Sequence, residues 1–442
     1  MSRKPDNQLV ASAKIRQILG ESTAILIDTI VQQAERRGLS LFLVGGVVRD
    51  IFLEVPNHDL DFVLEADAIR FAEELAERFG GRVLAHEAFG TAIWSLDSSA
   101  AENLQIPEHD APQHIDFARA RLETYPQPAA LPIVSPSDIR SDLRRRDFTL
   151  NSLAIQLSPA LESGRLLDGC GGVADLQDRL IRVLHEDSFV DDPTRILRAL
   201  RLRARMGFAI EAGTERFLGA ALPLLGRVTG KRLVNELDLV LSEPKADEIL
   251  LQLQDLGALL HIHPALRLSP DLPDQLTRFR QTQSPWAAAA DHGAVLWTLL
   301  LASVCDDDAL AICQRLDLPR NLTQSIMACS RLMRKSDVLR DPQSPPSEAV
   351  RILDGLPEPA LIAAWLILAD CPAAQNKLED FAEKWRHQRA MISGVDLTQM
   401  GIPPGPRYKR ILDALRFARI DGVVDSLEEE QMYLCELLLD ES

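Results

Sequence analysis

The sequence lacks the apolar segments that mark membrane-spanning or secreted proteins. None of its apolar runs reaches the roughly 18 residues that a transmembrane helix needs. Residues 1–10, MSRKPDNQLV, contain no apolar core of a secretory signal peptide. The chain is therefore expected to act in the cytoplasm without a membrane, and nothing in the sequence implies a protein partner.

The sequence also lacks paired cysteines and an excess of basic residues. The six cysteines are scattered without a CxxC pair, which indicates reduced thiols instead of disulfides or a zinc site. The chain has 48 basic and 65 acidic residues, so its net charge is −17. Nucleic-acid binders more often carry an excess of basic residues. Any binding of RNA would therefore have to use local basic patches. Two such patches are RSDLRRRD, which contains Arg144, Arg145 and Arg146, and RILRALRLRAR, which starts at Arg195.

Several common catalytic motifs are missing. The chain has no GxSxG nucleophile elbow and no HExxH zinc motif. Residues 226–232, GRVTGKR, differ from a P-loop in glycine spacing and have no Ser or Thr after the lysine. These absences argue against a serine hydrolase, a zinc peptidase of the HExxH type and a P-loop nucleotidase.

The hydrophobic periodicity predicts a mixed α/β region followed by an all-helical one. With 442 residues, of which 46% are hydrophobic, the chain is long enough for several packed domains. From about residue 174 almost every segment has a helical pattern. Residues 124–138 contain four prolines and are predicted to be a loop, and residues 341–348 resemble a linker. Before residue 174, helices are expected at 8–38 and 66–79, and strands at 40–48, 59–64, 82–96, 114–120 and 150–157.

Two aspartates, Asp59 and Asp61, fall on a predicted strand directly after a glycine turn. Side chains at i and i+2 of a strand share one face, about 6.6 Å apart at Cα. Two carboxylates this close repel each other unless a cation lies between them. Mg²⁺ is bound by such carboxylates together with substrate phosphates, so the pair predicts a Mg²⁺ site. Asp116, on a later predicted strand, is the best candidate for a third carboxylate.

The turn Gly45-Gly46 precedes this pair and is followed by Arg49 at an expected helix start. Glycines without a Cβ allow the backbone to approach phosphate groups closely. Taken singly, a glycine pair is only a turn and a DxD is common. The order strand, glycine turn, helix, strand with DxD predicts that the glycines bind phosphates while the aspartates hold the metal.

The segment DDPTRILRALRLRAR predicts a helix with an arginine stripe. At about 100° per residue, Arg195, Arg198, Arg201 and Arg205 lie within about 120° of one another. A plain amphipathic helix would also show this pattern. Asp192 and Arg195 lie three residues apart, so they share a face and could read a base edge as acceptor and donor. Asp192 could instead cap the helix.

With these motifs in hand, the chain resembles the class II tRNA nucleotidyltransferase and poly(A) polymerase family, which includes bacterial CCA-adding enzymes. The resemblance covers residues 40–240 strongly and 390–425 moderately. Its motifs are GGxVRD with DxD, RRDFTxN (Arg145 to Asn151), DxxGGxxDL (Asp168 to Leu176) and a nucleotide-templating motif (Asp191, Asp192 and Arg195). The last motif departs from the family pattern, because Asp191 stands where Glu is usual.

The resemblance implies an α+β protein with a polymerase-beta-like nucleotidyltransferase head that contains a mixed sheet. All-helical neck, body and tail domains would follow. The expected boundaries are 1–160 for the head, 161–230 for the neck, 231–340 for the body and 341–442 for the tail.

The resemblance also implies partners and residue roles. The partners would be tRNA, CTP and ATP, with Mg²⁺ as the cofactor. Asp192 and Arg195 would pair with the incoming base, and the loop at 124–138 would help to switch from C to A addition. The implied sites are Asp59, Asp61 and Asp116 for catalysis, with the first two on the metal; Gly45, Gly46, Arg49, Arg145, Arg146, Asp192, Arg195 and Arg198 for the nucleotide; and Arg201, Arg205, Arg407, Lys409 and Arg410 for RNA.

Three activities stay open at this point. The chain could add the whole CCA or only part of it, as CC-only and A-only members of the family do. It could be a poly(A) polymerase of the same fold, although the segment 390–425 has more tRNA-tail character than that reading predicts. An inactive RNA-binding protein is the non-enzymatic alternative, and the presence of both Asp59 and Asp61 argues against it.

Overall fold

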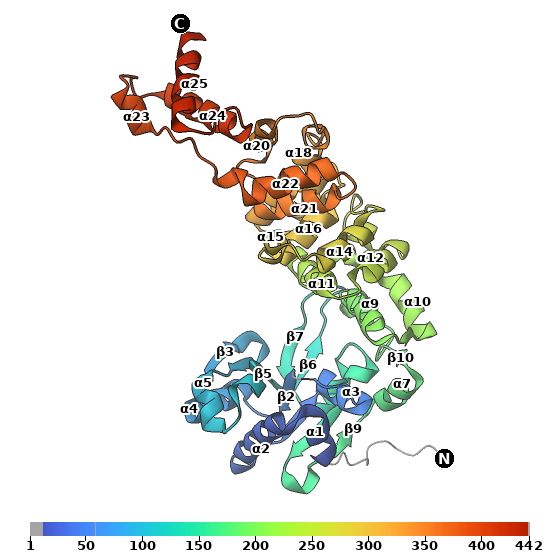
Figure 1. Cartoon of the computed structure of the whole chain (residues 1–442). Coiled ribbons are helices and arrows are strands. Elements are labelled where there is room, and N and C mark those ends of the chain that lie inside the picture. The colour runs from blue at the N-terminus through green and yellow to red at the C-terminus, as the bar shows by residue number, and fades with distance from the viewer. Residues whose placement is uncertain (1–11, 58, 441–442) are drawn as a thin grey trace. The chain divides into compact units, whose positions relative to one another are not determined.

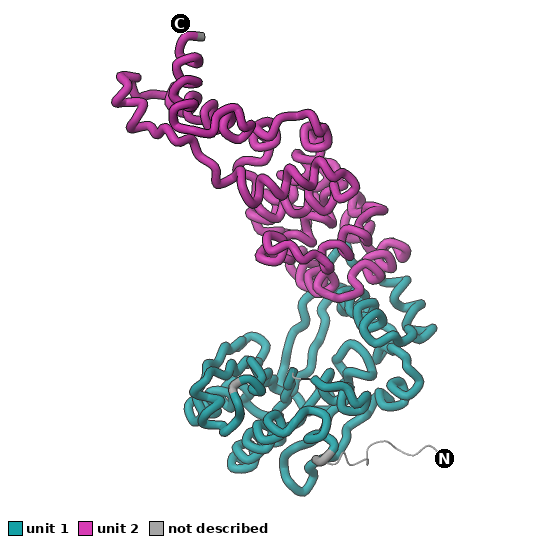
Figure 2. The backbone as a smooth tube through the Cα atoms, viewed as in Figure 1, with its two compact units in different colours: residues 1–228 teal, residues 229–442 magenta. Residues whose placement is uncertain are grey.

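The protein folds into two compact units, residues 1–228 and 229–442 (Figure 2). The computed structural model describes residues 12–57 and 59–440. Unit 1 contains all the strands found among these residues, and the described part of unit 2 is helical (Figure 1). The α+β fold class expected from the sequence is therefore confirmed.

Unit 1 is built on a seven-stranded mixed sheet. The neighbours β2 and β5 are parallel, whereas the other paired strands of this sheet are antiparallel. In spatial order the strands are β3 (Arg82–His86), β4 (Thr91–Ser95), β5 (His114–Arg119), β2 (Leu60–Leu64), β1 (Leu41–Val44), β8 (Ala154–Ser158) and β9 (Leu166–Leu167).

Helices and short pairs of strands complete unit 1. The helices are α1 (Ser12–Leu19), α2 (Glu21–Arg36), α3 (Gly46–Leu53), α4 (Ala68–Phe79), α5 (Ser98–Leu104), α6 (Ile139–Arg144), α7 (Gly172–Asp178), α8 (Ser188–Asp191), α9 (Arg195–Met206) and α10 (Ala212–Ala221). The 3₁₀ turns are η2 (Glu87–Phe89), η3 (Glu108–Asp110), η4 (Thr149–Asn151), η5 (Ala160–Glu162) and η6 (Leu222–Arg227). Two further sheets pair β6 (Arg121–Thr124) with β7 (Ile133–Pro136), and β10 (Leu180–Ile181) with β11 (Ala209–Ile210).

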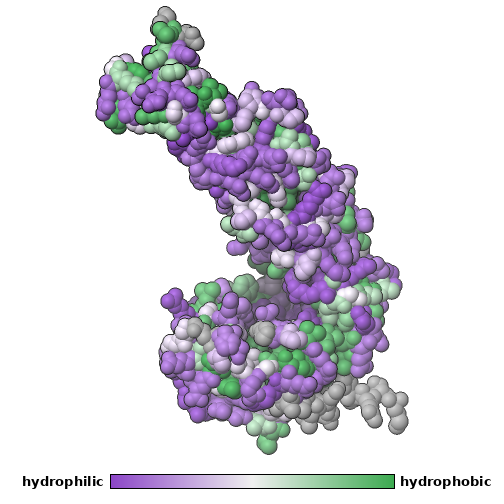
Figure 3. Space-filling model, in the orientation of Figure 1, coloured by the Kyte–Doolittle hydropathy of each residue, from purple (hydrophilic) through white to green (hydrophobic). Residues whose placement is uncertain are grey.

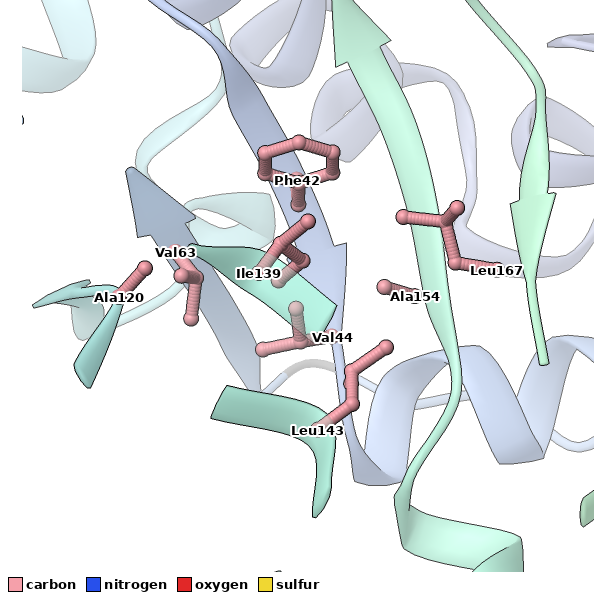
Figure 4. Packing of buried hydrophobic residues seen from close by; sticks show 8 residues of the cluster. All are labelled: Phe42, Val44, Val63, Ala120, Ile139, Leu143, Ala154 and Leu167. Atoms are coloured by element: carbon pink, nitrogen blue, oxygen red, sulfur yellow. The ribbon is translucent and has the colours of Figure 1, made fainter. Parts of the chain in front are cut away.

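A hydrophobic cluster fixes the face of the sheet that α6 covers (Figure 4). Phe42 and Val44 alternate along β1, so both point to the same face. Val63 of β2 pairs with Phe42, and Ala154 of β8 pairs with Val44, which extends this apolar face across three strands. Ile139 and Leu143 lie one helical turn apart on α6 and are buried in the same cluster. Burial of such side chains holds the strand ends, and hence the segments that follow them, in fixed positions.

Three predictions about unit 1 were wrong in part. The expected strand at 40–48 ends at Val44, and α3 already begins at Gly46, because the glycine turn redirects the chain. The expected helix at 8–38 is interrupted at Gly20, whose φ of 86° no helix accommodates. The segment 124–138 is not wholly a loop, since residues 133–136 pair with β6 as strand β7.

Unit 2 buries its most apolar helices at its centre. Helices α16 and α21 are apolar on almost every side, as expected of fully buried helices. Trp297 of α16 is 2% exposed, and its indole N–H donates to Asp238 at 2.6 Å. The helices are α11 (Gly230–Ser242), α12 (Ala246–Asp255), α13 (Ala258–Ile262), α14 (Leu272–Gln281), α15 (Pro285–Ala288), α16 (His292–Leu301), α17 (Asp306–Leu316), α18 (Arg320–Met333), α19 (Asp337–Arg340), α20 (Pro346–Leu353), α21 (Glu358–Ile367), α22 (Pro372–Glu383), α23 (Gly394–Gln399), α24 (Pro406–Ile420) and α25 (Leu427–Asp440), with the 3₁₀ turn η7 (Trp385–His387).

The surface of unit 2 is mostly hydrophilic on the face seen in Figure 3, which fits helices that turn their apolar stripes inward. The predicted linker at 341–348 runs into α20, which begins at Pro346. Across residues 12–57 and 59–440, no helix is both long and apolar enough to cross a membrane. The division into four domains remains a prediction.

Candidate active site

Two of the predicted catalytic aspartates lie side by side on parallel strands. Asp61 of β2 is in register with Asp116 of β5, 55 positions later in the sequence. Paired residues of neighbouring strands point to the same face, with backbones about 4.8 Å apart. Asp59 directly precedes β2 and is exposed. The sheet therefore brings Asp61 and Asp116 together on one face, and Asp59 lies close enough for its charge to act on both.

The pKa of Asp61 is raised to about 6 from the usual 3.8. Burial is the main cause; the Arg146 guanidinium opposes it, and the charges of Asp116 and Asp59 add to it. The pKa of Asp116 is raised as well, first by burial and then by Asp59, while His114 opposes the shift. Two ionised carboxylates with raised pKa values repel each other. A bound cation or proton relieves this repulsion, and such pairs are therefore candidates for functional sites.

These carboxylates fit a hard divalent cation. Carboxylate oxygens are the ligands that Mg²⁺ prefers, and it commonly takes only one or two from the protein, with water and substrate phosphates completing its octahedron. Among the described residues, no group of three or more His, Cys, Asp or Glu side chains is already arranged closely enough to enclose a metal ion. The donor set thus suits an ion that is shared with a substrate better than one held in a closed protein cage.

The raised pKa of Asp61 has a consequence for stability. Its folded pKa lies above the unfolded value, so its contribution to stability is fully present below about pH 4 and is lost as the pH rises through about 6. We expect Asp61→Asn to be more stable than wild type in EDTA at about pH 8, by up to about 3 kcal/mol, and equally stable at about pH 4. Urea unfolding at the two pH values measures this difference, and a constant offset would contradict it.

The glycine turn lies directly beside Asp61. Gly45 has φ 75° and ψ −132°, a conformation that other residues rarely adopt, and its N–H donates to the Leu153 carbonyl at 3.0 Å. A Cβ on Gly45 would lie 2.9 Å from Nη1 of Arg146 and 3.8 Å from a carboxylate oxygen of Asp61. The absence of a side chain at Gly45 therefore leaves room for the Arg146 guanidinium next to the aspartate.

The protein supplies hydrogen-bond acceptors for only some of the donors of the Arg146 guanidinium. Its Nη2 donates to Asp142 at 3.1 Å, but its Nε is buried and has no hydrogen-bond partner. A partly buried guanidinium with an unmet donor beside a helix N-terminus favours an anion. Arg146 is thus the arginine of this motif that best suits the predicted triphosphate.

We predict that Gly45→Ala lowers stability and nucleotide affinity much more than Gly46→Ala does. At Gly45 the substitution forces an unfavourable φ and displaces Arg146, at a cost of roughly 1–3 kcal/mol. At Gly46 a Cβ would make an ordinary contact of 3.6 Å with Arg49 at the start of a helix, so little change in stability is expected. Thermal unfolding and nucleotide affinity measured on both variants test this contrast, which equal effects would contradict.

Arg49 is fixed by neighbours in unit 1. It is 9% exposed, and Nε and Nη2 contact the two carboxylate oxygens of Asp50 at 2.7 and 3.0 Å. Its Nη1 donates to Oδ1 of Asn151 in η4 at 2.8 Å. The guanidinium is therefore held in one orientation at the first turn of α3, and its contact with a nucleotide stays a prediction.

Arg145 differs from Arg146 in its partners. Its guanidinium contacts Asp142 at 2.7 Å and Glu123 of β6 at 2.9 Å. Glu123 also accepts from Arg121 at 2.9 Å and from the hydroxyl of Tyr125 at 3.0 Å. The expected role of Arg145 on the triphosphate stays a prediction, but these contacts show that it ties the β6–β7 hairpin to α6.

The turn before α9 places the predicted base-reading pair. Arg195 is 6% exposed, and its Nη1 donates to the Ser188 hydroxyl at 2.6 Å while Nη2 donates to the Arg145 carbonyl at 2.8 Å. Asp192 accepts from the backbone N–H of Thr194 at 3.0 Å and from its hydroxyl at 2.6 Å. Both residues therefore have a local structural role beside any role in reading bases.

Asp147 and Arg198 form an ion pair that the sequence did not suggest. Arg198 donates to Asp147 at 2.6 and 3.0 Å. Burial would raise the pKa of Asp147, but the charge and hydrogen bonds of Arg198, the hydrogen bond from Asn151 and the charge of Arg195 outweigh it and hold the pKa at about 2. Arg201 is half-buried and Arg205 exposed further along α9, and each interacts with other groups.

The predicted RNA-binding residues of unit 2 lie on the first turns of α24. Lys409 and Arg410 are exposed, and Arg407 is half-buried. A cavity of about 700 Å³ lies alongside, and its lining includes Lys409, Arg410 and Arg351. Their contact with RNA stays a prediction.

Sequence reasoning missed Asn57, Glu123 and Tyr125, and it missed the partner of Asp147. Asp147 and Asn151 were visible as motif positions, but their partners come from α9 and α3. An extended alternation from Glu123 in β6 to Tyr125, which directly follows this strand, could have placed both side chains on one face. No sequence signal identifies their contact with Arg145.

Two family models match the chain. The poly A polymerase head domain matches residues 41–182, and the probable RNA and SrmB-binding site of polymerase A matches residues 207–268. The first match covers the seven-stranded sheet and the glycine turn.

The chain is also similar to several curated relatives. An A-adding tRNA nucleotidyltransferase of Geobacter sulfurreducens is 32% identical over 93% of this chain, which spans only 47% of that relative. Another A-adding tRNA nucleotidyltransferase, from Halalkalibacterium halodurans, is 31% identical over 91% of this chain and 90% of the relative. A CC-adding tRNA nucleotidyltransferase of Deinococcus radiodurans is 30% identical over 89% and 88%.

A solved structure agrees with these sequence matches. The Thermotoga maritima CCA-adding enzyme complexed with tRNA superposes with a TM-score of 0.74 at 27% identity, covering 98% of this chain and all of that one. Sequence and fold thus point to the same group of proteins.

Proposed function

Because the chain belongs to the family of tRNA nucleotidyltransferases that carry the poly A polymerase head domain, we propose that it adds nucleotides to the 3′ end of tRNA from CTP or ATP. The observation that carries this proposal is the register of Asp61 with Asp116 beside the Gly45 turn and Arg146. Acidic and basic groups meet there as phosphoryl transfer requires.

The proposed reaction is an in-line displacement. The terminal hydroxyl oxygen of the tRNA forms a bond to the α-phosphorus, and the bond from that phosphorus to the β-phosphate oxygen breaks, so that pyrophosphate leaves with the electron pair. Mg²⁺, when bound, would activate the hydroxyl and neutralise the charge on the phosphates. Asp59 and Asp61 would hold the ions, and Asp116, whose pKa is raised, would take the hydroxyl proton.

Other residues would bind and select the nucleotide. Arg146 and the backbone at Gly45 and Gly46 would contact the triphosphate. Asp192 and Arg195 would present an acceptor and a donor to the base. Arg49 would contact the triphosphate from the first turn of α3.

The four domains would divide this work. We propose that residues 1–160 carry catalysis, 161–230 select the base, 231–340 form the body, and 341–442 bind the tRNA. Action on tRNA would place the protein in the cytoplasm.

Addition of the terminal A alone is the second candidate. Two A-adding relatives are 32% and 31% identical, slightly above the 30% of the CC-adding relative. The reaction itself separates the two activities.

The test offers the protein three tRNAs, which lack CCA, end in C or end in CC, with CTP, ATP or both. Addition of all three nucleotides supports the full reaction, and extension only of the tRNA ending in CC supports A addition alone. Extension that stops at CC identifies a CC-adding enzyme, and long A tracts identify a poly(A) polymerase. Binding of tRNA without any extension would refute the proposed enzyme.

A further inference from the structure

Asn57 connects two parts of the candidate active site through one side chain. It lies between α3 and β2, and its Oδ1 accepts a hydrogen bond from the backbone N–H of Asp59 at 2.7 Å. Its Nδ2 donates to Oδ2 of Asp50 at 2.6 Å. Both ends of the amide are therefore used, one on the first aspartate of the pair and one on α3.

The α3 end of this link is rigid. Asp50 is held by two contacts to the Arg49 guanidinium, and Arg49 is in turn bonded to Asn151. The Asp50 side chain is 13% exposed and that of Arg49 is 10% exposed, so little water competes for these contacts. A continuous chain of hydrogen bonds thus runs from η4 through α3 to the backbone of Asp59.

Because Oδ1 and Nδ2 of Asn57 are both hydrogen-bonded, this residue does more than form a turn. An Asx turn requires only that Oδ1 accept from the N–H two residues later, which aspartate or serine could also do. Contact with the Asp50 carboxylate additionally requires a donor of this length. Asparagine supplies the acceptor and the donor together, without adding a charge to the three carboxylates nearby.

We infer that Asn57 is a positioning residue that fixes Asp59, and with it the divalent cation, relative to Arg49. This inference rests on the proposed function, because it takes Asp59 as a metal ligand. Partners that orient a metal ligand typically affect metal affinity or activity by about 10–100-fold when they are removed. Asp59 is exposed and lies before its strand. Without Asn57, its backbone N–H would lose the hydrogen bond that orients the residue.

The experiment compares Asn57→Ala and Asn57→Ser in the full-length protein. Alanine removes both contacts, whereas serine keeps an acceptor for the Asp59 N–H but cannot reach Asp50. Mn²⁺ binding without substrate, followed by electron paramagnetic resonance, is the first measurement. We expect both variants to bind Mn²⁺ about 10–100-fold more weakly than wild type.

The second measurement is the Mg²⁺ concentration that gives half-maximal nucleotide addition. We expect it to rise by about the same factor in both variants, with turnover largely restored at saturating Mg²⁺. Asn103→Ala is the matched control, because the Asn103 amide donates to the Phe79 carbonyl in the same unit, away from the aspartates. Asn103→Ala should leave Mn²⁺ affinity unchanged.

Two results would overturn the inference. Wild-type Mn²⁺ affinity in Asn57→Ser would reduce Asn57 to a turn residue, and wild-type affinity in both variants would remove any positioning role. Asp59→Asn separates this outcome from failure of the proposed function. If Asp59→Asn itself binds Mn²⁺ normally, Asp59 is not a metal ligand and the proposed chemistry fails first.

Discussion

Asp61→Asn should lower the rate of nucleotide addition by at least about 1000-fold while tRNA affinity stays close to that of wild type. The substitution keeps the shape of the side chain but removes the charge with which Asp61, together with Asp59, would hold a divalent cation in the proposed reaction. Metal ions contribute several kcal/mol of transition-state stabilisation in such reactions, and each 1.4 kcal/mol is about tenfold in rate. Single-turnover extension of tRNA measures the loss, and a filter-binding titration measures the affinity.

Asp97→Asn is the matched control for this prediction. Asp97 caps α5 by accepting a hydrogen bond from the N–H of Ala100, a task that asparagine performs equally well. The control should therefore retain wild-type turnover and stability. Turnover in Asp61→Asn within about tenfold of wild type would show that Asp61 holds no catalytic metal.

Local spacing predicted the turn at Gly45 but only part of the arrangement of the aspartates. The i, i+2 spacing predicted Asp59 and Asp61 on one face of a strand, whereas β2 begins at Leu60 and Asp59 lies just before it. Asp116 is a different case, because its place beside Asp61 depends on the pairing of β2 with β5, two strands far apart in sequence. A strand pattern around Asp116 made it a candidate, but the register came only from the fold.

The arginines show why charge runs were harder to interpret. Arg145 and Arg146 are adjacent in sequence, yet one is clamped by Glu123 and Asp142 and the other retains an unmet buried donor. Helical periodicity placed Arg195 on a stripe that was expected to face a substrate. Its guanidinium is bonded to Ser188 and to the Arg145 carbonyl, and its role towards a substrate stays a prediction. Such partners come from other elements, so no pattern within α9 could identify them.

The wrong sequence predictions for unit 1 have a common cause. An apolar run such as 40–48 fits a strand, but Gly45 with a positive φ ends β1 after Val44 and starts α3. In 124–138 the prolines predicted a loop, yet β7 lies at the edge of a two-stranded sheet, where a proline is tolerated. Backbone conformation and pairing outweighed the local residue pattern in both places.

Asp147→Ala should destabilise the protein by about 3 kcal/mol. Asp147 is 8% exposed and accepts hydrogen bonds from the Phe148 N–H, the Asn151 amide and the Arg198 guanidinium. Removing one partner of a buried pair costs about 3–5 kcal/mol. We take the lower value because the Arg198 side chain is 42% exposed and can turn to water.

Thermal unfolding should show this loss as a fall in Tm of about 6–12 °C for a unit of this size. Asp147→Asn keeps the acceptor for the Phe148 N–H but loses the charge, so it separates the ion pair from the backbone contact. Because the folded pKa of Asp147, about 2, lies below the usual 3.8, the charge stabilises the fold above about pH 4 and this contribution is lost as the pH falls towards 2. Wild type should therefore exceed Asp147→Asn in stability by about 2 kcal/mol at neutral pH, with the gap closing below about pH 4. A gap that stays constant with pH would show that the carboxylate acts through its shape and not through its charge on Arg198.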